Sequence, residues 1–200
     1  MKIVLASNNA GKLAELGAMF APLGVQWLRQ SDLGIPEAPE PHHTFVENAL
    51  AKARHASALS GLPALADDAG LCVDAFGGLP GVQTAYYCLQ FGYEKSDANN
   101  LRALLEQMQE VTQRRAAMVS TLVAVRSPQD PEPLIAVGRA VGEIARTPVG
   151  SGGFGFDPVM FIPELGCTFA ELSDEVKNAH SHRGKAARDM LRLMRERWLA

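Results

Sequence analysis

The pattern of apolar and polar positions along the first third of the chain predicts alternating strands and helices. An apolar run at 2–6 has the composition of a strand, and apolar residues at helical spacing follow at 13–20. Two asparagines between these segments can cap the helix. A second strand is predicted at 25–28, and a capping-box pattern opens an alanine-rich helix at 44–60.

The remainder of the chain continues the alternation. Short apolar pieces at 64–66 and 71–73 predict strand segments, and apolar spacing at 101–108 predicts a third amphipathic helix. Two long β-prone runs, 118–125 and 134–144, predict a hairpin with a loose, proline-containing connection. A final amphipathic helix is predicted at the C-terminus.

These elements place the chain in the α/β class. We find no internal repeat and no linker long enough to divide the sequence, so we expect a single domain over residues 1–200. That domain forms either one body or two lobes around a cleft.

Composition narrows the function classes. The chain has 200 residues, of which 47% are hydrophobic and 20% charged, and this is enough to build a packed core. A net charge of -3 without runs of like charge argues against a nucleic-acid partner. No apolar run approaches the roughly 20 residues of a membrane span, and the N-terminus has too few apolar residues for a secretory signal, so we expect a cytoplasmic protein that does not bind membranes.

The first candidate site lies between the first predicted strand and the first predicted helix. Backbone N–H groups at a helix N-terminus, short polar side chains and one lysine suit a phosphate group. An ordinary helix cap with a solvated lysine is the alternative, and the sequence lacks the pattern of a Walker loop. The residues are Ser7, Asn8, Asn9, Ala10, Gly11 and Lys12.

The second candidate is the acidic pair Asp67 and Asp68, which precedes Ala69 and Gly70. If the backbone is extended here, the two carboxylates point to opposite faces and do different jobs. Mg²⁺ takes one or two carboxylates and completes its shell with water and substrate phosphates. An Asx turn between two strands is the alternative. Glu40 is a further candidate ligand oxygen.

The third candidate is a glycine-rich loop with two aromatic residues. Its backbone can approach a planar ligand while an aromatic face stacks on that ligand, and a plain surface loop is the alternative. The residues concerned are Phe154, Gly155, Phe156 and Asp157.

The fourth candidate gathers cations where the last helix is expected to begin. Lys177, His180, His182 and Arg183 surround Ser181, although a helix N-terminus disfavours positive charge, so we expect an anion nearby. The spacing of the two histidines does not suit a zinc site.

Taken in order, these motifs are more specific than any one of them. Ser-Asn-Asn-Ala-Gly-Lys, Thr-Phe-Val-Glu-Asn-Ala, Ala-Asp-Asp-Ala-Gly-Leu, Gly-Gly-Phe-Gly-Phe-Asp-Pro and Ser-His-Arg-Gly resemble the inosine triphosphate pyrophosphatase family, over nearly the whole chain. The resemblance implies a mixed, twisted sheet with flanking helices, two lobes around a nucleotide cleft, and a homodimer. It also implies Mg²⁺-dependent hydrolysis of noncanonical purine nucleoside triphosphates (ITP, dITP and XTP) to the monophosphate and pyrophosphate.

The resemblance also assigns roles to individual residues. Asp68 matches the catalytic acidic residue and a metal ligand, and Glu40 is the only acidic residue left where relatives often carry an acidic pair. Many bacterial relatives read Ser-Ala-Arg-Tyr where this chain has Thr84-Ala85-Tyr86-Tyr87, so the arginine of that motif is replaced by Tyr86. The expected substrate-binding residues are Ser7, Asn8, Asn9, Ala10, Gly11, Lys12, Ala69, Phe154, Gly155, Phe156, Asp157, Lys177, His182 and Arg183.

In the expected mechanism, Asp68 takes a proton from the attacking water or positions a metal-bound water, and Glu40 or Asp67 helps to hold the ion. Donors from Arg183 or His182 would read the O6 edge of the purine. Two rival functions stay open at this point: a non-catalytic nucleotide-binding sensor, and a house-cleaning pyrophosphatase that acts on other modified nucleotides.

Overall fold

The structure is a computed structural model that describes residues 1–199, and it divides into two compact units. Unit 1 comprises residues 1–68, 120–138 and the chain from 183 onward, and unit 2 comprises 69–119 and 139–182. The chain passes from one unit to the other within three long strands and at the start of the last helix. Each unit is described by itself below.

The strands form one seven-stranded sheet in the order β2-β1-β3-β4-β5-β6-β7. β1 pairs in parallel with β2 and β3, whereas β6 is antiparallel to β5 and β7, so the sheet is mixed as expected. The strands are β1 Lys2–Leu5, β2 Gln26–Arg29, β3 Ala64–Val73, β4 Arg115–Val125, β5 Leu134–Ile144, β6 Met160–Ile162 and β7 Cys167–Thr168.

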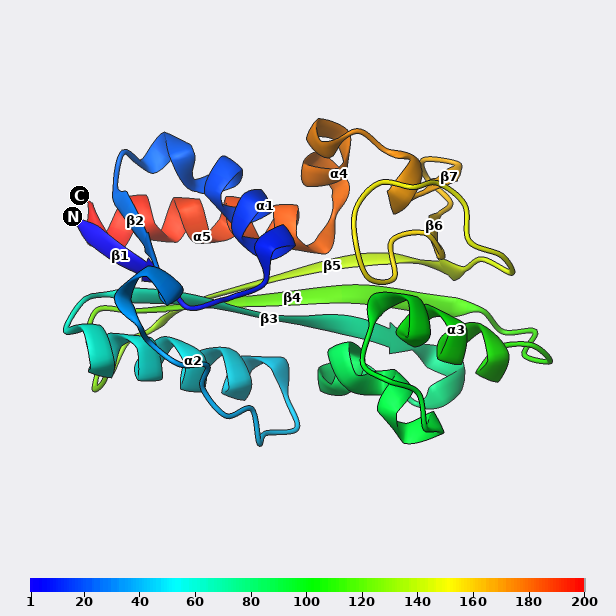
Figure 1. Cartoon of the computed structure of the whole chain (residues 1–200). Helices are drawn as coiled ribbons and strands as arrows, with labels where there is room; N and C mark the ends of the chain where they lie inside the picture. The colour runs from blue at the N-terminus through cyan, green and yellow to red at the C-terminus, as the bar shows by residue number, and fades with distance from the viewer. Residues whose placement is uncertain (200) are drawn as a thin grey trace. The chain divides into compact units, whose positions relative to one another are not determined.

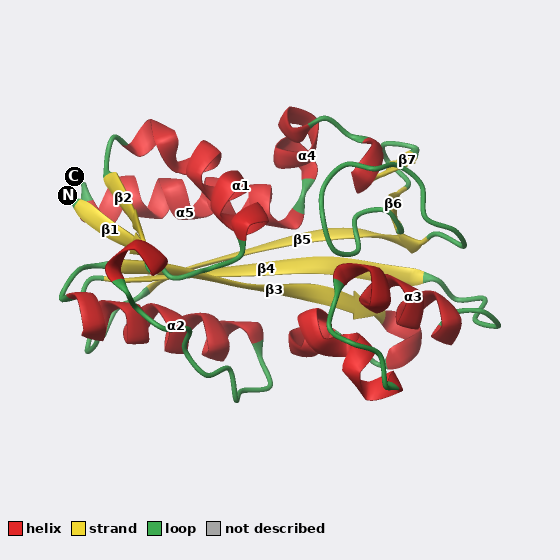
Figure 2. Cartoon of the chain, viewed as in Figure 1, coloured by secondary structure: helices red, strands yellow, loops and turns green. Residues whose placement is uncertain are grey.

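The described part of the chain also contains five α-helices and five 3-10 segments (Figure 2). The α-helices are α1 Ala10–Phe20, α2 Phe45–Ser60, α3 Asp97–Gln107, α4 Asp174–His180 and α5 His182–Trp198. The 3-10 segments are η1 Ala21–Leu23, η2 Ser31–Leu33, η3 Asp74–Phe76, η4 Gly81–Phe91 and η5 Phe169–Glu171. None of the helices in the described chain is long and apolar enough to cross a membrane.

The starts of α1 and α2 follow the predicted capping residues. Asn9 caps α1 by accepting the Lys12 N–H at 3.0 Å, and Thr44 caps α2 by accepting the N–H of Glu47. α2 ends at Gly61, whose positive φ of 68° lets its amide bond back to a carbonyl of the last turn. The expected cap chemistry therefore sets both ends of α2.

Unit 1 has three layers, with α1 and α5 on one face of its strands and α2 on the other (Figure 1). The alternation of side chains along β1 explains this arrangement. Ile3 and Leu5 enter the core that contains α1 and α5, while Val4 and Ala6 enter the core beneath α2. The amphipathic last helix is confirmed, because its apolar face completes the first of these cores.

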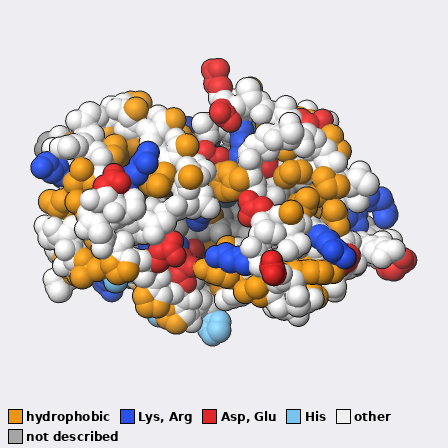
Figure 3. Space-filling model, viewed as in Figure 1, with side chains coloured by type: hydrophobic (Ala, Val, Ile, Leu, Met, Phe, Trp, Pro, Cys, Tyr) orange, Lys and Arg blue, Asp and Glu red, His pale blue; other side chains and the backbone are white. Residues whose placement is uncertain are grey.

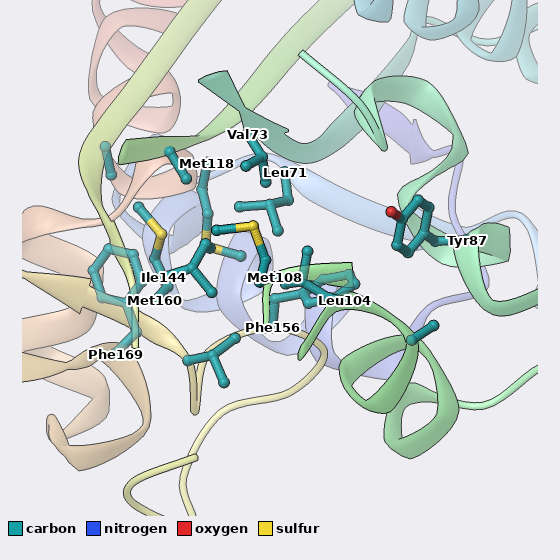
Figure 4. Packing of buried hydrophobic residues seen from close by; sticks show 14 of the residues in the cluster. Leu71, Val73, Tyr87, Leu104, Met108, Met118, Ile144, Phe156, Met160 and Phe169 are labelled. Carbon is teal, nitrogen blue, oxygen red and sulfur yellow. The ribbon is translucent and has the colours of Figure 1, made fainter. Parts of the chain in front are cut away.

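Unit 2 has its own core, in which residues of α3 pack against β3, β4, β5 and β6 (Figure 4). Leu104 and Met108 from the end of α3 are fully buried here. β5 alternates strictly between buried and exposed positions, so one of its faces serves the core. The buried residues labelled in the figure are Leu71, Val73, Tyr87, Leu104, Met108, Met118, Ile144, Phe156, Met160 and Phe169.

The interruption expected between 64–66 and 71–73 is wrong. β3 runs without a break from Ala64 to Val73, so Asp67 and Asp68 lie within a strand and not in an Asx turn. Both aspartates are buried, at 2% and 6% exposure, and each has a cationic partner. That pairing is what allows two carboxylates to occupy a buried strand.

Charged side chains of both signs are mixed on the face of the protein that Figure 3 draws. On the face drawn in Figure 3, the lysines and arginines of the described chain lie among aspartates and glutamates and do not merge into one basic patch. The absence of a nucleic-acid partner stays a prediction.

Candidate active site

The segment from Ser7 to Lys12 forms the junction between β1 and the N-terminus of α1. Its polar side chains make local hydrogen bonds: Ser7 Oγ accepts the Asn9 N–H at 3.2 Å, and Asn8 Oδ1 accepts an N–H of Gln30 at 3.1 Å. These bonds fix the loop while the first turn of α1 presents backbone N–H groups. A helix N-terminus of this kind attracts anions.

Lys12 turns its side chain toward β3. Its ammonium lies 3.0 Å from Asp67 Oδ2, and 17% of the side chain is exposed. Burial lowers the pKa of Lys12, and nearby Arg183 lowers it further, while Asp67 partly offsets both. The cation at the end of the predicted phosphate loop is therefore held in place by a carboxylate of the chain itself.

Asp67 is the centre of a buried charge cluster. Its Oδ1 accepts the Ser120 hydroxyl at 2.6 Å, and its Oδ2 faces Lys12 and Arg183, the latter at 3.1 Å. Burial alone would raise the pKa of Asp67, but the two cations outweigh it and hold the pKa well below its usual range. Both oxygens are used in this way, so the arrangement does not support Asp67 as a metal ligand.

Arg183 is bound by two carboxylates. Its guanidinium contacts Asp67 and also Glu15 of α1, and only 3% of its side chain is exposed. Burial would lower the pKa of Arg183, but Asp67 and Glu15 raise it overall. Asp67 and Glu15 thus supply negative charge of the kind expected near the start of the last helix.

Asp68 lies on the opposite face of β3, where it meets a residue of α2. Its Oδ1 accepts a hydrogen bond from Lys52 at 2.8 Å, and the same ammonium binds Glu40. Burial raises the pKa of Asp68, and Lys52 acts in the other direction. The two aspartates therefore point to opposite faces as predicted, because their partners come from different helices on different faces, while the different jobs expected of them stay a prediction.

The residues on this face fit a divalent cation. Asp68 Oδ2 is buried and has no hydrogen-bond partner among the described residues, and the carboxylate of Glu40 is held on the same ammonium. The described chain contains no group of three or more His, Cys, Asp or Glu side chains suited to a metal, but Mg²⁺ requires only one or two carboxylates beside substrate phosphates.

Two hydrogen bonds from a buried side chain hold the loop that carries Glu40. Asn48, at 2% exposure, accepts the His42 N–H at 3.0 Å and donates to the His42 carbonyl at 3.2 Å. Asn48 follows Thr44 on α2, so the start of the helix and the loop that carries Glu40 and His42 are joined by one buried amide.

Unit 2 holds the second group of candidate residues, and Asp157 is its centre. Asp157 Oδ2 accepts the Phe154 N–H at 2.8 Å and lies 2.7 Å from the Lys177 ammonium. That ammonium stands 4.8 Å from the centre of the Phe154 ring. A Cβ on Gly153 would come within 2.1 Å of the same carboxylate oxygen, so only glycine fits there.

The two phenylalanines of the glycine-rich loop differ. Phe156 is only 2% exposed and belongs to the core of unit 2 (Figure 4), whereas Phe154 is half-buried under Lys177. The Gly155 N–H donates to Asp97 at 3.0 Å, which ties the loop to the start of α3. Phe154 is therefore the aromatic ring that this loop could offer to a ligand.

The cation-rich segment spans two helices and not one helix start. Lys177 and His180 lie in α4, Ser181 separates the helices, and His182 begins α5. His182 is buried at 4% exposure, and its ring centre lies 6.5 Å from that of Phe169. The helix break explains why Lys177 meets Asp157 in unit 2 while Arg183 meets Asp67 in unit 1.

The candidate residues thus form two groups. Unit 1 brings together the Ser7–Lys12 loop, Glu40, Asp68 and Arg183, and unit 2 contains Ala69, which lies in β3, with Phe154, Gly155, Phe156, Asp157, Lys177 and His182. That all of them line one pocket stays a prediction. The sequence interpretation missed Glu15 and Ser120, although Glu15 stands at helical i, i+3 spacing from Lys12.

Comparison with known proteins places the chain among close relatives. A dITP/XTP pyrophosphatase of Albidiferax ferrireducens is 81% identical over 199 residues, with 100% of both chains covered. Another of Paracidovorax citrulli is 78% identical over 198 residues, covering 99% of this chain and 100% of the relative. Among solved structures, a HAM1 protein of Coxiella burnetii is 40% identical with a TM-score of 0.90, and 98% of this chain and 99% of that chain are covered.

The fold and its site define an α/β protein with a polar loop at a strand-to-helix junction and paired buried charges on both faces of one strand. The model of the Ham1 family matches residues 3–193. This chain belongs to the Ham1 family, which confirms the resemblance noted from its motifs.

Proposed function

We propose that this protein hydrolyses noncanonical purine nucleoside triphosphates, dITP, XTP and ITP, to the monophosphate and pyrophosphate. The observation that carries the proposal is the 81% identity, over the full length of both chains, to a protein named dITP/XTP pyrophosphatase. The charges described above are consistent with this chemistry and suggest how the chain performs it.

The balance of charged side chains in unit 1 suggests that nucleotide binding needs an added cation. Lys12, Lys52 and Arg183 are matched in unit 1 by a larger number of carboxylates: Glu15, Glu40, Asp67 and Asp68. A nucleoside triphosphate carries about four negative charges, and it would be repelled by such a cluster unless a metal ion compensates. The N-terminal amides of α1 supply only partial positive charge.

We propose Mg²⁺ as that ion, held by Asp68 and Glu40. Bound Mg²⁺ neutralises phosphate charge and makes water easier to deprotonate. Lys52 fixes Oδ1 of Asp68 and leaves Oδ2 without a partner in the described chain. In our proposal this oxygen orients the attacking water, and it acts either as the acceptor of the water's proton or as a ligand of the ion, while the Ser7–Lys12 loop binds the phosphates.

Selection of the base is proposed to fall to Phe154 and to donors from His182 and Arg183. Phe154 stacks on the purine, and Lys177 with Asp157 keeps its ring in place. Hypoxanthine and xanthine offer O6 as an acceptor and N1–H as a donor, whereas adenine reverses both. A donor facing the adenine amino group stays unpaired, and sites of this kind can discriminate by a factor of roughly 10⁴.

Pyrophosphate release from a panel of eight or so nucleotides, with and without Mg²⁺, tests the proposal. We expect rapid release of pyrophosphate and monophosphate from ITP, dITP and XTP, little from ATP, and none when the metal is chelated. Nucleotide binding without any release would favour the sensor, and release confined to modified pyrimidines would favour the other house-cleaning activity. A cytoplasmic location and a homodimer stay predictions, and light scattering tests the second of these.

A further inference from the structure

Three side chains of α2 hold the loop that carries Glu40. This loop, residues 36–43, contains three prolines and has neither helix nor strand structure. Within the described chain, its hydrogen bonds and its ion pair all come from Asn48, Lys52 and His55. Spacings of four and three residues put these side chains on one face of the helix. α2 therefore binds the loop along one line of its surface.

His55 is the contact that the proposed function has not used. Its Nε2 lies 3.0 Å from the carbonyl oxygen of Pro36, and a carbonyl can only accept, so the ring donates this hydrogen bond from Nε2. Pro36 stands four residues before Glu40. On the other side, Asn48 binds the backbone of His42, two residues after Glu40. Glu40 is thus flanked by two points at which α2 fixes the backbone of the loop.

The fold does not need the bond from His55 for its stability. Ile35, the residue before the loop, is buried at 6% exposure in the core beneath α2 and already anchors the chain. The bond itself lies where water can replace either partner, so its loss costs little stability. What it restricts is the direction in which Pro36 leads the chain away from Ile35. Because each proline also fixes its own φ, a loop held at both ends has few ways to move its middle.

Glu40 depends on such support from its backbone. A third of its side chain is exposed, and an ion pair that water can screen holds a carboxylate only weakly. Its partner Lys52 also binds Asp68, the other proposed ligand of Mg²⁺. A carboxylate on a mobile loop would have to be ordered when the ion binds, which weakens binding. A loop that is fixed beforehand avoids this loss.

We propose that His55 is a positioning residue, which fixes the start of the loop at 36–43 and so keeps Glu40 beside Asp68 for Mg²⁺. The inference rests on the proposed function, because it takes Glu40 to be a ligand of the ion. In the described chain His55 donates to Pro36, whereas Lys52 pairs with the two carboxylates. A change of His55 therefore leaves both proposed ligands and their shared cation in place.

The dependence of pyrophosphate release from ITP on free Mg²⁺ gives the first test. Loss of a residue that orients a metal ligand directly costs about 10–100-fold in metal affinity, and His55 acts one step further away, through the backbone. We expect His55→Ala to raise the Mg²⁺ concentration for half-maximal release by about three- to tenfold, with kcat at saturating Mg²⁺ within about twofold of the wild type. His55→Gln offers an N–H at a similar place and should recover most of the shift. An unchanged Mg²⁺ requirement in His55→Ala, or equal shifts in the two variants, would overturn the inference.

Hydrogen exchange of the His42 amide gives a second readout, which needs neither metal nor nucleotide. That N–H donates to Asn48 at 3.0 Å on the far side of Glu40, so it reports whether the loop as a whole is held. We expect it to exchange at least about threefold faster in His55→Ala and near the wild-type rate in His55→Gln. An unchanged rate in His55→Ala refutes the positioning role, because the loop would then be held without His55.

Arg54→Ala is the matched control. Arg54 precedes His55 on α2, is exposed, and makes no hydrogen bond or ion pair with the loop in the described chain, so this variant should match the wild type in both assays. Shifts as large as those of His55→Ala would count against the inference. If the wild-type protein releases no pyrophosphate from ITP, dITP or XTP, the proposed function fails, while exchange of the His42 amide still decides whether His55 holds the loop.

Discussion

Exchanging each of the two adjacent aspartates for asparagine should separate catalysis from stability. Asp68→Asn keeps the size of the side chain and an oxygen that can accept from Lys52, but it removes the proposed proton acceptor. Asp67→Asn makes the same chemical change one residue earlier in β3. The two variants are therefore matched controls for each other.

The expected magnitudes follow from the partners of each carboxylate. Loss of a general base lowers kcat by about 10²–10⁴, which corresponds to roughly 3–5 kcal/mol of activation free energy. The stability of Asp68→Asn should change by only about 1–2 kcal/mol, because Lys52 keeps Glu40 as a partner. Asp67 has a fully buried side chain that faces two cations, so its loss should cost about 3–5 kcal/mol of unfolding free energy.

Rapid-quench measurement of pyrophosphate release gives kcat, and calorimetry gives the affinity for ITP in the presence of Mg²⁺. Urea unfolding gives the stability of each variant. We expect Asp68→Asn to bind ITP nearly as well as the wild type while turnover is lost. Near-normal turnover in this variant, or a larger loss of stability than in Asp67→Asn, would refute the assignment of the two carboxylates.

Three further predictions test the supporting structure. Gly153→Ala places a Cβ on a backbone with φ of 70°, against Asp157, and should cost about 1–3 kcal/mol or more in urea unfolding and weaken nucleotide binding, whereas Gly155→Ala meets no atom within 4 Å and should cost less. Leu104→Ala in the core of unit 2 should cost about 2–5 kcal/mol in the same assay, and a loss below 1 kcal/mol would contradict its full burial. Ser120→Ala removes a 2.6 Å hydrogen bond to a buried carboxylate and should cost about 1.5–3 kcal/mol, again by urea unfolding, with an unchanged midpoint as the contrary result.

Local chemistry made much of the fold predictable from the sequence. The capping residues Asn9 and Thr44 mark the starts of α1 and α2, and the boundaries of β5 at Leu134 and Ile144 match the predicted run. These signals act within a few residues, so one sequence is enough to detect them. The amphipathic C-terminal helix was predictable for the same reason.

Contacts between residues far apart in the sequence are the part of the site that sequence patterns do not predict. The contact between Glu15 and Arg183 spans 168 positions, and no local pattern announces which carboxylate will meet which cation. The burial of Phe156 was not predictable either, because a phenylalanine in a glycine-rich loop gives no sign of the direction of its ring, which the core of unit 2 decides. The break between α4 and α5 was missed because Ser181 can equally cap one helix or separate two.

The continuity of β3 is the feature that gives the two aspartates different chemistry. In a turn, adjacent carboxylates could share one ion, and neither would be distinguished by its surroundings. In a strand they point to opposite faces, so Asp67 meets Lys12 and Arg183 while Asp68 meets Lys52. Burial and cations then act on the pKa values in opposite senses, keeping Asp67 strongly ionised and raising the pKa of Asp68 toward the range in which a carboxylate is a better proton acceptor. A one-residue shift in the register of β3 would exchange these environments, so the strand itself, and not only the identity of its acidic residues, determines the surroundings of each aspartate.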